Sequence, residues 1–373
     1  MEVRAAPAAR RTPWVALGTA LALALAATWQ LLPLRAHALR TPLLSPALQR
    51  AAACLATRAP PPAATVDVLI FSKDRPLQLL ALLESQARHV AHAGAVAVVV
   101  RATSAETAAG YQLVAALHPS VHFEWQAQAS RDWLGRAAFR RSVVAALAVL
   151  RAPFVAPLVD EVVWLRPVDL ADVASALAQL GGQGTFQLRL GLHYTNAAAA
   201  KPREWRAGAP GRPRVSCYEW TSRTMQPPNF AYTAIVDAGV YPAARLRREW
   251  AAIGGYRGYH HPGELEGGWY DAQPGYAPGC VHLLYDNSSV VNNERSDSAG
   301  RVVTVRDDYA GSAGPDNQRA LLNDTRAMLA GWRLDTAPFD GMLPPYGHVR
   351  VPLRLVPLVA PGSGCVDPRS PGG

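Results

Sequence analysis

Two charged segments each directly follow an apolar run with the pattern of a buried strand. Ser72-Lys73-Asp74-Arg75 follows Val66–Phe71, and Asp160-Glu161 closes the run that starts at Phe154. Buried strands do not tolerate unpaired carboxylates, so the acid pair needs a cation, an arginine or water. A hard divalent ion such as Mn²⁺ or Mg²⁺ suits oxygen ligands and would offset the negative charge of a diphosphate. A salt bridge with Arg166 is the alternative.

The segment 72–75 carries groups that suit a nucleotide. Backbone amides and the cations Lys73 and Arg75 would hold a diphosphate, or the Asp74 carboxylate would bind a base or ribose. Lys73 and Lys201 are the chain's two lysines among its 37 basic residues, which makes a lysine at this place informative. The alternative is an ordinary strand-to-helix turn in which Asp74 caps the following helix.

A third polar group occupies the glycine-rich segment His260–Trp269. Sugar rings stack on aromatic side chains, and a carboxylate can take the proton from an attacking hydroxyl, so Glu266 or Glu264 is the candidate base if a product is inverted. Asp237 ends another apolar run and would hydrogen-bond a sugar. The alternatives are a solvated loop for the glutamates and a cap for Asp237.

Apolar runs and amphipathic segments alternate through the first half of the ordered chain. This alternation predicts an α/β fold with a doubly wound, mostly parallel sheet, in which ligands bind beyond the carboxyl ends of the strands. The expected strands are 66–71, 95–100, 121–126 and 154–165, and the expected helices are 77–89, 107–117, 132–150 and 169–180. The second half is less regular and predicts an acceptor-side half on the same sheet. Its expected strands are 186–191, 229–237 and 281–286, and its expected loops are 197–228 and 254–280.

The N-terminal part has the pattern of a membrane anchor and stem. Residues 12–34 carry no charge and are long enough to cross a bilayer as a helix. We therefore expect a cytoplasmic tail (1–11), a signal anchor (12–34), a Pro-rich stem (35–65), a folded domain (66–336) and a Pro-rich tail (337–373). A cleaved signal peptide, which would give a secreted protein, is the alternative.

Composition narrows the function classes. The chain of 373 residues is 50% hydrophobic and 17% charged, which supports a large core. Its net charge of +9 comes almost entirely from arginines distributed along the sequence, with no run of basic residues interleaved with aromatic ones. We therefore expect no nucleic-acid partner. The motifs of serine hydrolases, P-loop proteins, dinucleotide oxidoreductases and zinc proteases are absent from the sequence.

Four cysteines and two glycosylation patterns fit an oxidising, lumenal compartment. The glycosylation acceptors by pattern are Asn287 and Asn323. A Cys217–Cys280 disulfide is the preferred pairing, because both residues fall in the folded region, and free thiols are the alternative.

Three segments carry a resemblance to a known family. LIFSKDRPLQLLALLES (69–85), PLVDEVVWLRP (157–167) and FQLRLG (186–191) resemble GT-A-type glycosyltransferase-like domains, and the likeness spans 66–297. The resemblance implies a nucleoside-diphosphate-sugar donor, Mn²⁺ (or Mg²⁺) and a glycan or glycoprotein acceptor. With the anchor, it implies a single-pass type II protein of the Golgi membrane.

The resemblance also implies roles for individual residues. Phe71, Lys73, Asp74 and Arg75 would face the nucleotide, Asp160 and Glu161 would face the metal and ribose, and Asp237 and Glu266 would be acceptor or catalytic groups. One departure stands out: Val162 occupies the position of the second acid in the family's Asp-x-Asp motif. His282 is the candidate for the missing metal ligand; otherwise arginines would neutralise the diphosphate.

Two other classes stay open. A lumenal sugar-binding or scaffolding protein could keep this fold without catalysis, and Val162 favours that reading. A nucleotidyltransferase on a similar sheet is the third, although the anchor and the glycosylation patterns speak against it.

Overall fold

A computed structural model describes the folded part of the chain with short gaps. The described residues are 66–126, 133–181, 183–194, 197–208, 212–219, 228–231, 234–253, 259–272, 281–293, 315–345, 348–349 and 354–358. The expected tail (1–11), anchor (12–34) and stem (35–65) lie outside them. Within the described ranges, no helix is long and apolar enough to span a bilayer.

The first half is a parallel sheet wound in both directions from its first strand. β1 (Val66–Lys73) lies between β3 (Ala93–Arg101) and β5 (Phe154–Val159), and β4 (His122–Trp125) pairs with the outer side of β3. The chain thus builds β1, β3 and β4 outwards and then crosses back to the other side of β1. The reversal leaves a crevice at the carboxyl ends of β1 and β5, where open α/β sheets bind their ligands.

The second half extends the same sheet beyond β5. Its strands are β11 (Gly239–Pro242), β8 (Thr185–Gln187), β12 (His282–Tyr285), β10 (Val215–Tyr218) and β9 (Arg203–Arg206), in that spatial order. β11 and β10 run opposite to the other strands of this nine-stranded sheet. The mixed α/β class and the mostly parallel direction of the sheet are therefore confirmed.

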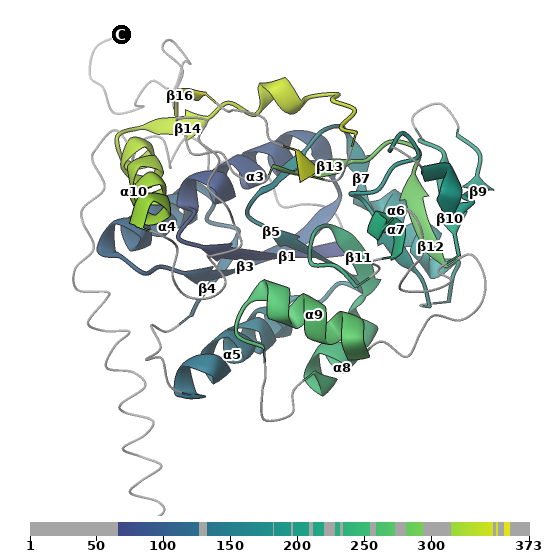
Figure 1. Cartoon of the computed structure of the whole chain (residues 1–373), viewed down its shortest axis with the longest axis horizontal. Helices are drawn as coiled ribbons and strands as arrows, with labels where there is room; N and C mark the ends of the chain where they lie inside the picture. The colour runs from purple at the N-terminus through teal and green to yellow at the C-terminus, as the bar shows by residue number, and fades with distance from the viewer. Residues whose placement is uncertain are drawn as a thin grey trace, which may run out of the picture. The chain divides into compact units, whose positions relative to one another are not determined.

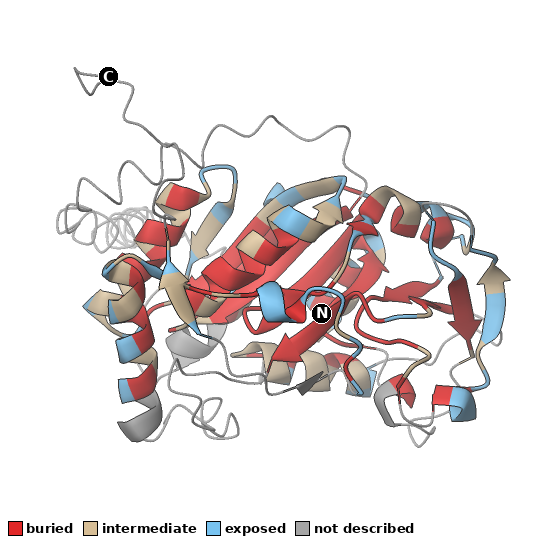
Figure 2. Cartoon of the chain, turned by 90° about the horizontal axis from the view of Figure 1, so that it is seen from above, coloured by how far each residue is buried: buried red, intermediate tan, exposed pale blue. Residues whose placement is uncertain are grey.

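Helices cover both faces of the parallel half (Figure 1). On one face lie α3 (Pro76–His89), α4 (Ala105–Leu117) and α10 (Pro315–Leu329); on the other lie α5 (Trp133–Val149), α8 (Ala243–Ala252) and α9 (Pro262–Ala272). Figure 2 shows the central strands buried along their length and helices that are buried on one side. This burial pattern explains why the strands read as continuous apolar runs and the helices as amphipathic ones.

Helix starts in this half follow ordinary capping chemistry. Ser104 and Thr107 form a capping box at the start of α4, and Asp169 accepts a hydrogen bond from Ala171 N at the start of α6 (Leu170–Ala178). α3 begins instead with Pro76, whose missing N–H costs nothing at the first helical position.

The predicted strand 154–165 is wrong in its middle. β5 ends at Val159, Asp160 and Glu161 form a turn, and β6 (Val162–Trp164) belongs to a separate sheet with β13 (Val290–Asn293) and β15 (His348–Val349). The two acids interrupt the strand because they form a turn in which their carboxylates contact Arg75. Strand alternation therefore does not place Val162 beside Asp160.

Three other predictions in the second half are wrong. The expected loop 197–228 contains β9 and β10. The expected strand 229–237 begins in a short helix, α7 (Pro228–Ala231), and pairing starts only at β11. The expected loop 254–280 contains α9, where Leu265 and Trp269 are buried one turn apart. The Trp269 ring packs 5.6 Å from that of Trp250, so tertiary packing outweighs the low helix propensity of Gly267 and Gly268.

The remaining short elements join distant segments. β2 (Val90–Ala91) pairs with β7 (Val168–Asp169), and β14 (Trp332–Leu334) pairs with β16 (Leu355–Pro357). Two 3₁₀ turns complete the set, at Ala197–Ala200 and Ala337–Phe339.

One buried carboxylate ties the amino ends of the central strands together. Asp67 in β1 accepts hydrogen bonds from Ala95 N at 2.8 Å, Arg151 N at 2.5 Å and Ala152 N at 2.7 Å. Its side chain is 2% exposed, so these three donors have little access to water. The contact joins β1 to β3 and to the segment that leads into β5.

We predict that Asp67→Ala lowers the free energy of unfolding by about 3 kcal/mol or more, because three buried N–H groups lose their acceptor. Urea denaturation followed by circular dichroism measures the loss. Asp67→Asn, which keeps one acceptor oxygen, should lose less. Equal losses in both variants would contradict the assigned hydrogen bonds.

Candidate active site

Strand register brings the two predicted segments to one rim of the sheet. Phe71 in β1 is paired with Val159 in β5, and Asp160 N donates to the Phe71 carbonyl at 3.1 Å. Asp160 Oδ2 then accepts from Ser72 Oγ at 2.8 Å and from Lys73 N at 3.3 Å. Lys73 and Asp160 therefore lie together at the carboxyl ends of β1 and β5.

A cavity of about 640 Å³ opens at this rim. Its size is that of a site for a small organic ligand. Among the residues that line it are eight predicted site residues: Phe71, Lys73, Asp74, Arg75, Asp160, Glu161, Asp237 and Glu266. Leu321 and Leu322 of α10 also line it, although they lie far along the chain.

The turn after β1 is held in an unusual conformation. Asp74 has φ 58°, the left-handed region that aspartate enters more readily than most residues. Its carboxylate accepts from Thr103 N at 2.6 Å, Thr103 Oγ1 at 2.9 Å and Thr107 Oγ1 at 3.2 Å. The alternative in which Asp74 caps α3 is therefore wrong: it ties the β1 turn to the start of α4.

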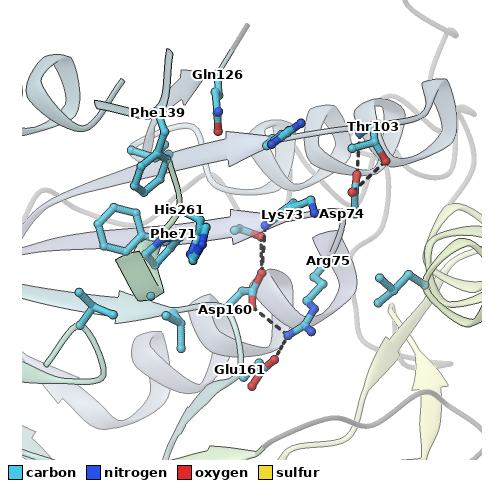
Figure 3. A pocket seen from close by; sticks show the side chains of 18 of the residues that line it. Phe71, Lys73, Asp74, Arg75, Thr103, Gln126, Phe139, Asp160, Glu161 and His261 are labelled. Carbon is cyan, nitrogen blue, oxygen red and sulfur yellow. Dashed lines mark hydrogen bonds and ion pairs between the residues drawn. The ribbon is translucent and has the colours of Figure 1, made fainter. Parts of the chain in front are cut away.

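Arg75 forms ion pairs with both acids (Figure 3). Arg75 Nη1 contacts Glu161 Oε1 and lies 3.6 Å from Asp160 Oδ1, and all three side chains are at most 12% exposed. Burial raises the pKa of Asp160, and the Arg75 charge and the Ser72 hydrogen bond act against that rise. Arg166, the alternative partner, donates instead to the Met342 carbonyl at 2.5 Å.

Tyr111 of α4 contacts two residues of this cluster, Ser72 and Arg75, and was not predicted from the sequence. Its hydroxyl lies 2.7 Å from Ser72 Oγ and accepts from Arg75 N at 3.0 Å. Burial, and then the negative charge of Asp160, raise the pKa of Tyr111 well above its usual value, which keeps the phenol neutral. Nothing in the apolar pattern of 105–117 signals this contact.

The donor set at the acid pair does not fit a divalent ion. Asp160 Oδ2 already accepts two hydrogen bonds, while Asp160 Oδ1 and Glu161 Oε1 face the Arg75 guanidinium. Val162 is a buried apolar side chain in β6. In the described ranges, no three or more His, Cys, Asp or Glu side chains are grouped so as to hold a metal.

His282 is not placed to complete a metal shell, which corrects that prediction. Its ring is fully buried in β12, where Nδ1 lies 2.7 Å from Thr185 Oγ1 and the ring stacks on Tyr218 at 5.1 Å. Burial lowers the pKa of His282 to about 3. His282 does not line the cavity.

A second arginine–acid cluster contributes Asp237 and Asn292 to the cavity lining. Arg189 Nη1 lies 2.9 Å from Asp237 Oδ2, which also accepts from Asn292 Nδ2 at 3.2 Å. Arg189 and Asn292 were not predicted: Arg189 lies in a segment that reads as an ordinary strand, and no strand was expected at Asn292. Burial, and then the charge of Asp237, raise the pKa of Glu266 well above its usual value.

Glu264 differs from Glu266 in its surroundings. It does not line the cavity, and its side chain is 42% exposed. Its carboxylate lies 2.6 Å from His260 Nδ1 and 3.5 Å from His261 Nε2. Of the two predicted glutamates, the structure therefore brings Glu266 alone to the other site residues.

The far end of the cavity is aromatic. Phe71 is 2% exposed, and its ring packs 5.6 Å from that of Phe139 and 6.2 Å from that of Trp250. Figure 3 shows Phe71 and Phe139 on the side of the view away from Arg75, with His261 between Phe71 and Lys73. Phe71 thus serves both as core packing and as cavity wall.

Cys217 in β10 is disulfide-bonded. Its predicted partner, Cys280, lies outside the described residues, so the pairing stays a prediction. The two glycosylation acceptors, Asn287 and Asn323, are both exposed.

The chain is similar to several solved structures at low scores. Mannosyltransferase PcManGT from Pyrobaculum calidifontis, in complex with GDP-Man and Mn²⁺, is 16% identical, with a TM-score of 0.32 over 79% of this chain and 83% of that one. For S. aureus TarS 1–349 the identity is 12% and the TM-score 0.37, over 70% of this chain and 71% of that one. In a longer S. aureus TarS structure, the match covers 29% of that chain.

Mouse xyloside xylosyltransferase 1 in its apo form matches 60% of this chain and 97% of that one, at 12% identity and a TM-score of 0.27. No protein-family model and no curated protein sequence matches the chain. TM-scores below 0.5 are too low to assign a function, so the proposals below rest on the chain's own residues.

We predict that Glu266→Gln is more stable than the wild type at neutral pH and equally stable in acid. The raised pKa means that the folded state favours the protonated carboxyl. The wild-type protein therefore has its full free energy of unfolding below pH 4.5, the usual pKa, and loses part of it as the pH rises through the raised pKa. The difference should grow by up to about 1.4 kcal/mol per pH unit in that window.

Urea denaturation at several pH values measures this difference. Glu204→Gln, at a glutamate whose side chain is 57% exposed, is the matched control and should stay within about 0.5 kcal/mol of the wild type. A stability difference for Glu266→Gln that does not change with pH would contradict the buried environment assigned to this carboxyl.

Proposed function

We propose that this chain is a glycosyltransferase that uses a nucleoside-diphosphate sugar as donor and a glycan or glycoprotein as acceptor. One observation carries the proposal: one cavity at the switch point of the sheet is lined both by cations and by carboxylates. Sugar transfer from a diphosphate needs both.

The diphosphate would bind at the wall formed by the β1 turn. Lys73 and Arg75 line the cavity there, and Arg101 of β3 adds a third cation to the lining. Lysine binds phosphate as a point charge and arginine as a planar fork, and both stabilise the charge that develops on a leaving diphosphate. The nucleoside would extend toward the end of the cavity that contains Phe71 and Phe139.

The acceptor hydroxyl would lose its proton to Glu266 in an inverting reaction. The acceptor oxygen forms a bond to the anomeric carbon, the bond from that carbon to the phosphate oxygen breaks, and its electron pair leaves with the nucleoside diphosphate. The hydroxyl proton passes to the Glu266 carboxylate. A carboxyl with a raised pKa is the stronger base once ionised, and Arg189 favours that ionised form.

Asp237 would orient the sugar rather than accept the proton. Its Oδ2 is held by Arg189 and Asn292, so its carboxylate is fixed in the cavity wall. A fixed acceptor of this kind suits a sugar hydroxyl.

The expected Mn²⁺ (or Mg²⁺) enters no step of this scheme. The family resemblance would place the metal ion at Asp160 and Glu161. Both of these carboxylates are ion-paired with Arg75.

The lumenal, Golgi-membrane setting belongs to the proposal on sequence grounds. The uncharged segment 12–34 supports an anchor, and a disulfide at Cys217 supports an oxidising compartment. A cleaved signal peptide and a secreted protein would fit the same observations.

A binding protein that has lost catalysis is the second candidate. The engagement of both acids by Arg75 favours it, because these carboxylates are the expected metal ligands. Such a protein would bind a nucleotide sugar without consuming it.

A panel of nucleotide sugars offered to the folded domain tests the proposal. We expect one donor to be consumed, with release of its nucleoside diphosphate, which is measured directly. We also expect Lys73→Gln to weaken binding of that nucleoside diphosphate about tenfold or more, since a charge-assisted phosphate contact is lost.

Lys201→Gln is the matched control, since Lys201 is the other lysine of the chain and is exposed. Binding without consumption would favour the second candidate. Equal binding by both variants would remove Lys73 from the diphosphate site.

For turnover, we predict that Glu266→Gln lowers kcat about a hundredfold or more with little change in donor affinity, because the amide cannot accept a proton. Steady-state kinetics with the identified donor and acceptor measure both constants. A variant with wild-type kcat would exclude Glu266 as the base.

A further inference from the structure

Arg75 occupies the position at the acid pair that a bridging cation would need. Its guanidinium lies against Glu161 Oε1 and 3.6 Å from Asp160 Oδ1, and it lines the cavity together with both acids. Figure 3 shows the arginine reaching from the β1 turn toward the two carboxylates. A positive charge is thus fixed beside the two acids in the lining of the cavity.

The arginine is held there from several sides. Its own backbone N–H donates to the Tyr111 hydroxyl, which in turn lies against Ser72. Ser72 and the Lys73 amide bind the other oxygen of Asp160. The Asp74 carboxylate fixes the same turn through Thr103 and Thr107. The contact is therefore part of a packed network and not one rotamer of an exposed arginine.

A divalent ion at these acids would have to displace Arg75 or lie beside it. Mn²⁺ and Mg²⁺ need carboxylate lone pairs at about 2.0–2.2 Å, and the facing oxygens of Asp160 and Glu161 are directed at the guanidinium. Two cations at adjacent positions also repel each other. A guanidinium carries five N–H donors and stays charged, so it can face carboxylates and phosphate together.

We infer that the Arg75 guanidinium supplies, within the chain, the positive charge that a divalent ion would otherwise supply between Asp160, Glu161 and a bound diphosphate. Nucleoside diphosphates then bind without a divalent ion. This inference rests on the proposed function, because it presupposes a diphosphate in the cavity.

Thermal unfolding of the folded domain with UDP, GDP, ADP or CDP tests the inference, with each nucleotide in EDTA and in Mn²⁺. We expect at least one nucleotide to raise Tm in EDTA by the same amount as in Mn²⁺. A rise that needs Mn²⁺ would overturn the inference and leave the proposed function standing. No rise with any nucleotide in either buffer would count against the proposed function itself, and the inference would fall with it.

Arg75→Ala gives a second, opposite readout. In this variant the nucleotide effect in EDTA should fall about tenfold or more in apparent affinity. Mn²⁺ alone should now raise Tm, because the carboxylates of Asp160 and Glu161 become available, and Asp160→Asn in the same variant should remove that rise. A rise of wild-type Tm with Mn²⁺ alone that Asp160→Asn abolishes would overturn the inference.

Arg354→Ala is the matched control. Arg354 pairs with Asp335 at 2.8 Å, its side chain is 79% exposed, and it does not line the cavity. Its nucleotide response should equal that of the wild type. If Arg75→Ala does not fold, the wild-type comparison of EDTA with Mn²⁺ still decides the question.

Discussion

The Asp160 carboxylate holds the ends of β1 and β5 together through hydrogen bonds from Ser72 and the Lys73 amide and through the charge of Arg75. Burial opposes the ionised form of this carboxyl, and its donors and the arginine favour it. Removing one of these partners leaves a buried polar or charged group without full compensation. The stability lost is then larger than the net contribution of the intact interaction. These contacts fix the positions of the cavity-lining residues at the ends of β1 and β5.

A similar arrangement recurs where Arg189 and Asn292 hold Asp237. Both clusters pair an arginine with acids at the ends of short, buried strands. Both contribute carboxylates to the cavity lining, and their contacts leave these charges little freedom to rearrange. Such preorganised charges are effective because they do not have to reorient when charge develops on a ligand.

The apolar periodicity of the first half was enough to predict its sheet, and the rule that ligands bind at the carboxyl ends of parallel strands placed Lys73 beside Asp160. Other parts of the site depend on contacts that no local pattern carries. Tyr111 reads as one more apolar residue of a helix, yet it contacts Ser72, 39 residues away. Arg189 reads as part of a strand, but β8 ends at Gln187 and frees it to reach Asp237, 48 residues on. Asp74 reads as a helix cap, and its positive φ turns it toward the neighbouring helix instead.

One wall of the cavity comes from the last long helix. Leu321 and Leu322 of α10 line the same space as Lys73, and α10 packs on α3 and α4, with Gln78 donating to Asp324 at 3.1 Å. The region of family likeness, 66–297, stops short of this helix. A recombinant version trimmed to that region would keep the charged residues of both arginine–acid clusters and still lack Leu321 and Leu322 from the cavity lining. A version of the chain that keeps the whole cavity lining therefore needs to extend past Leu329.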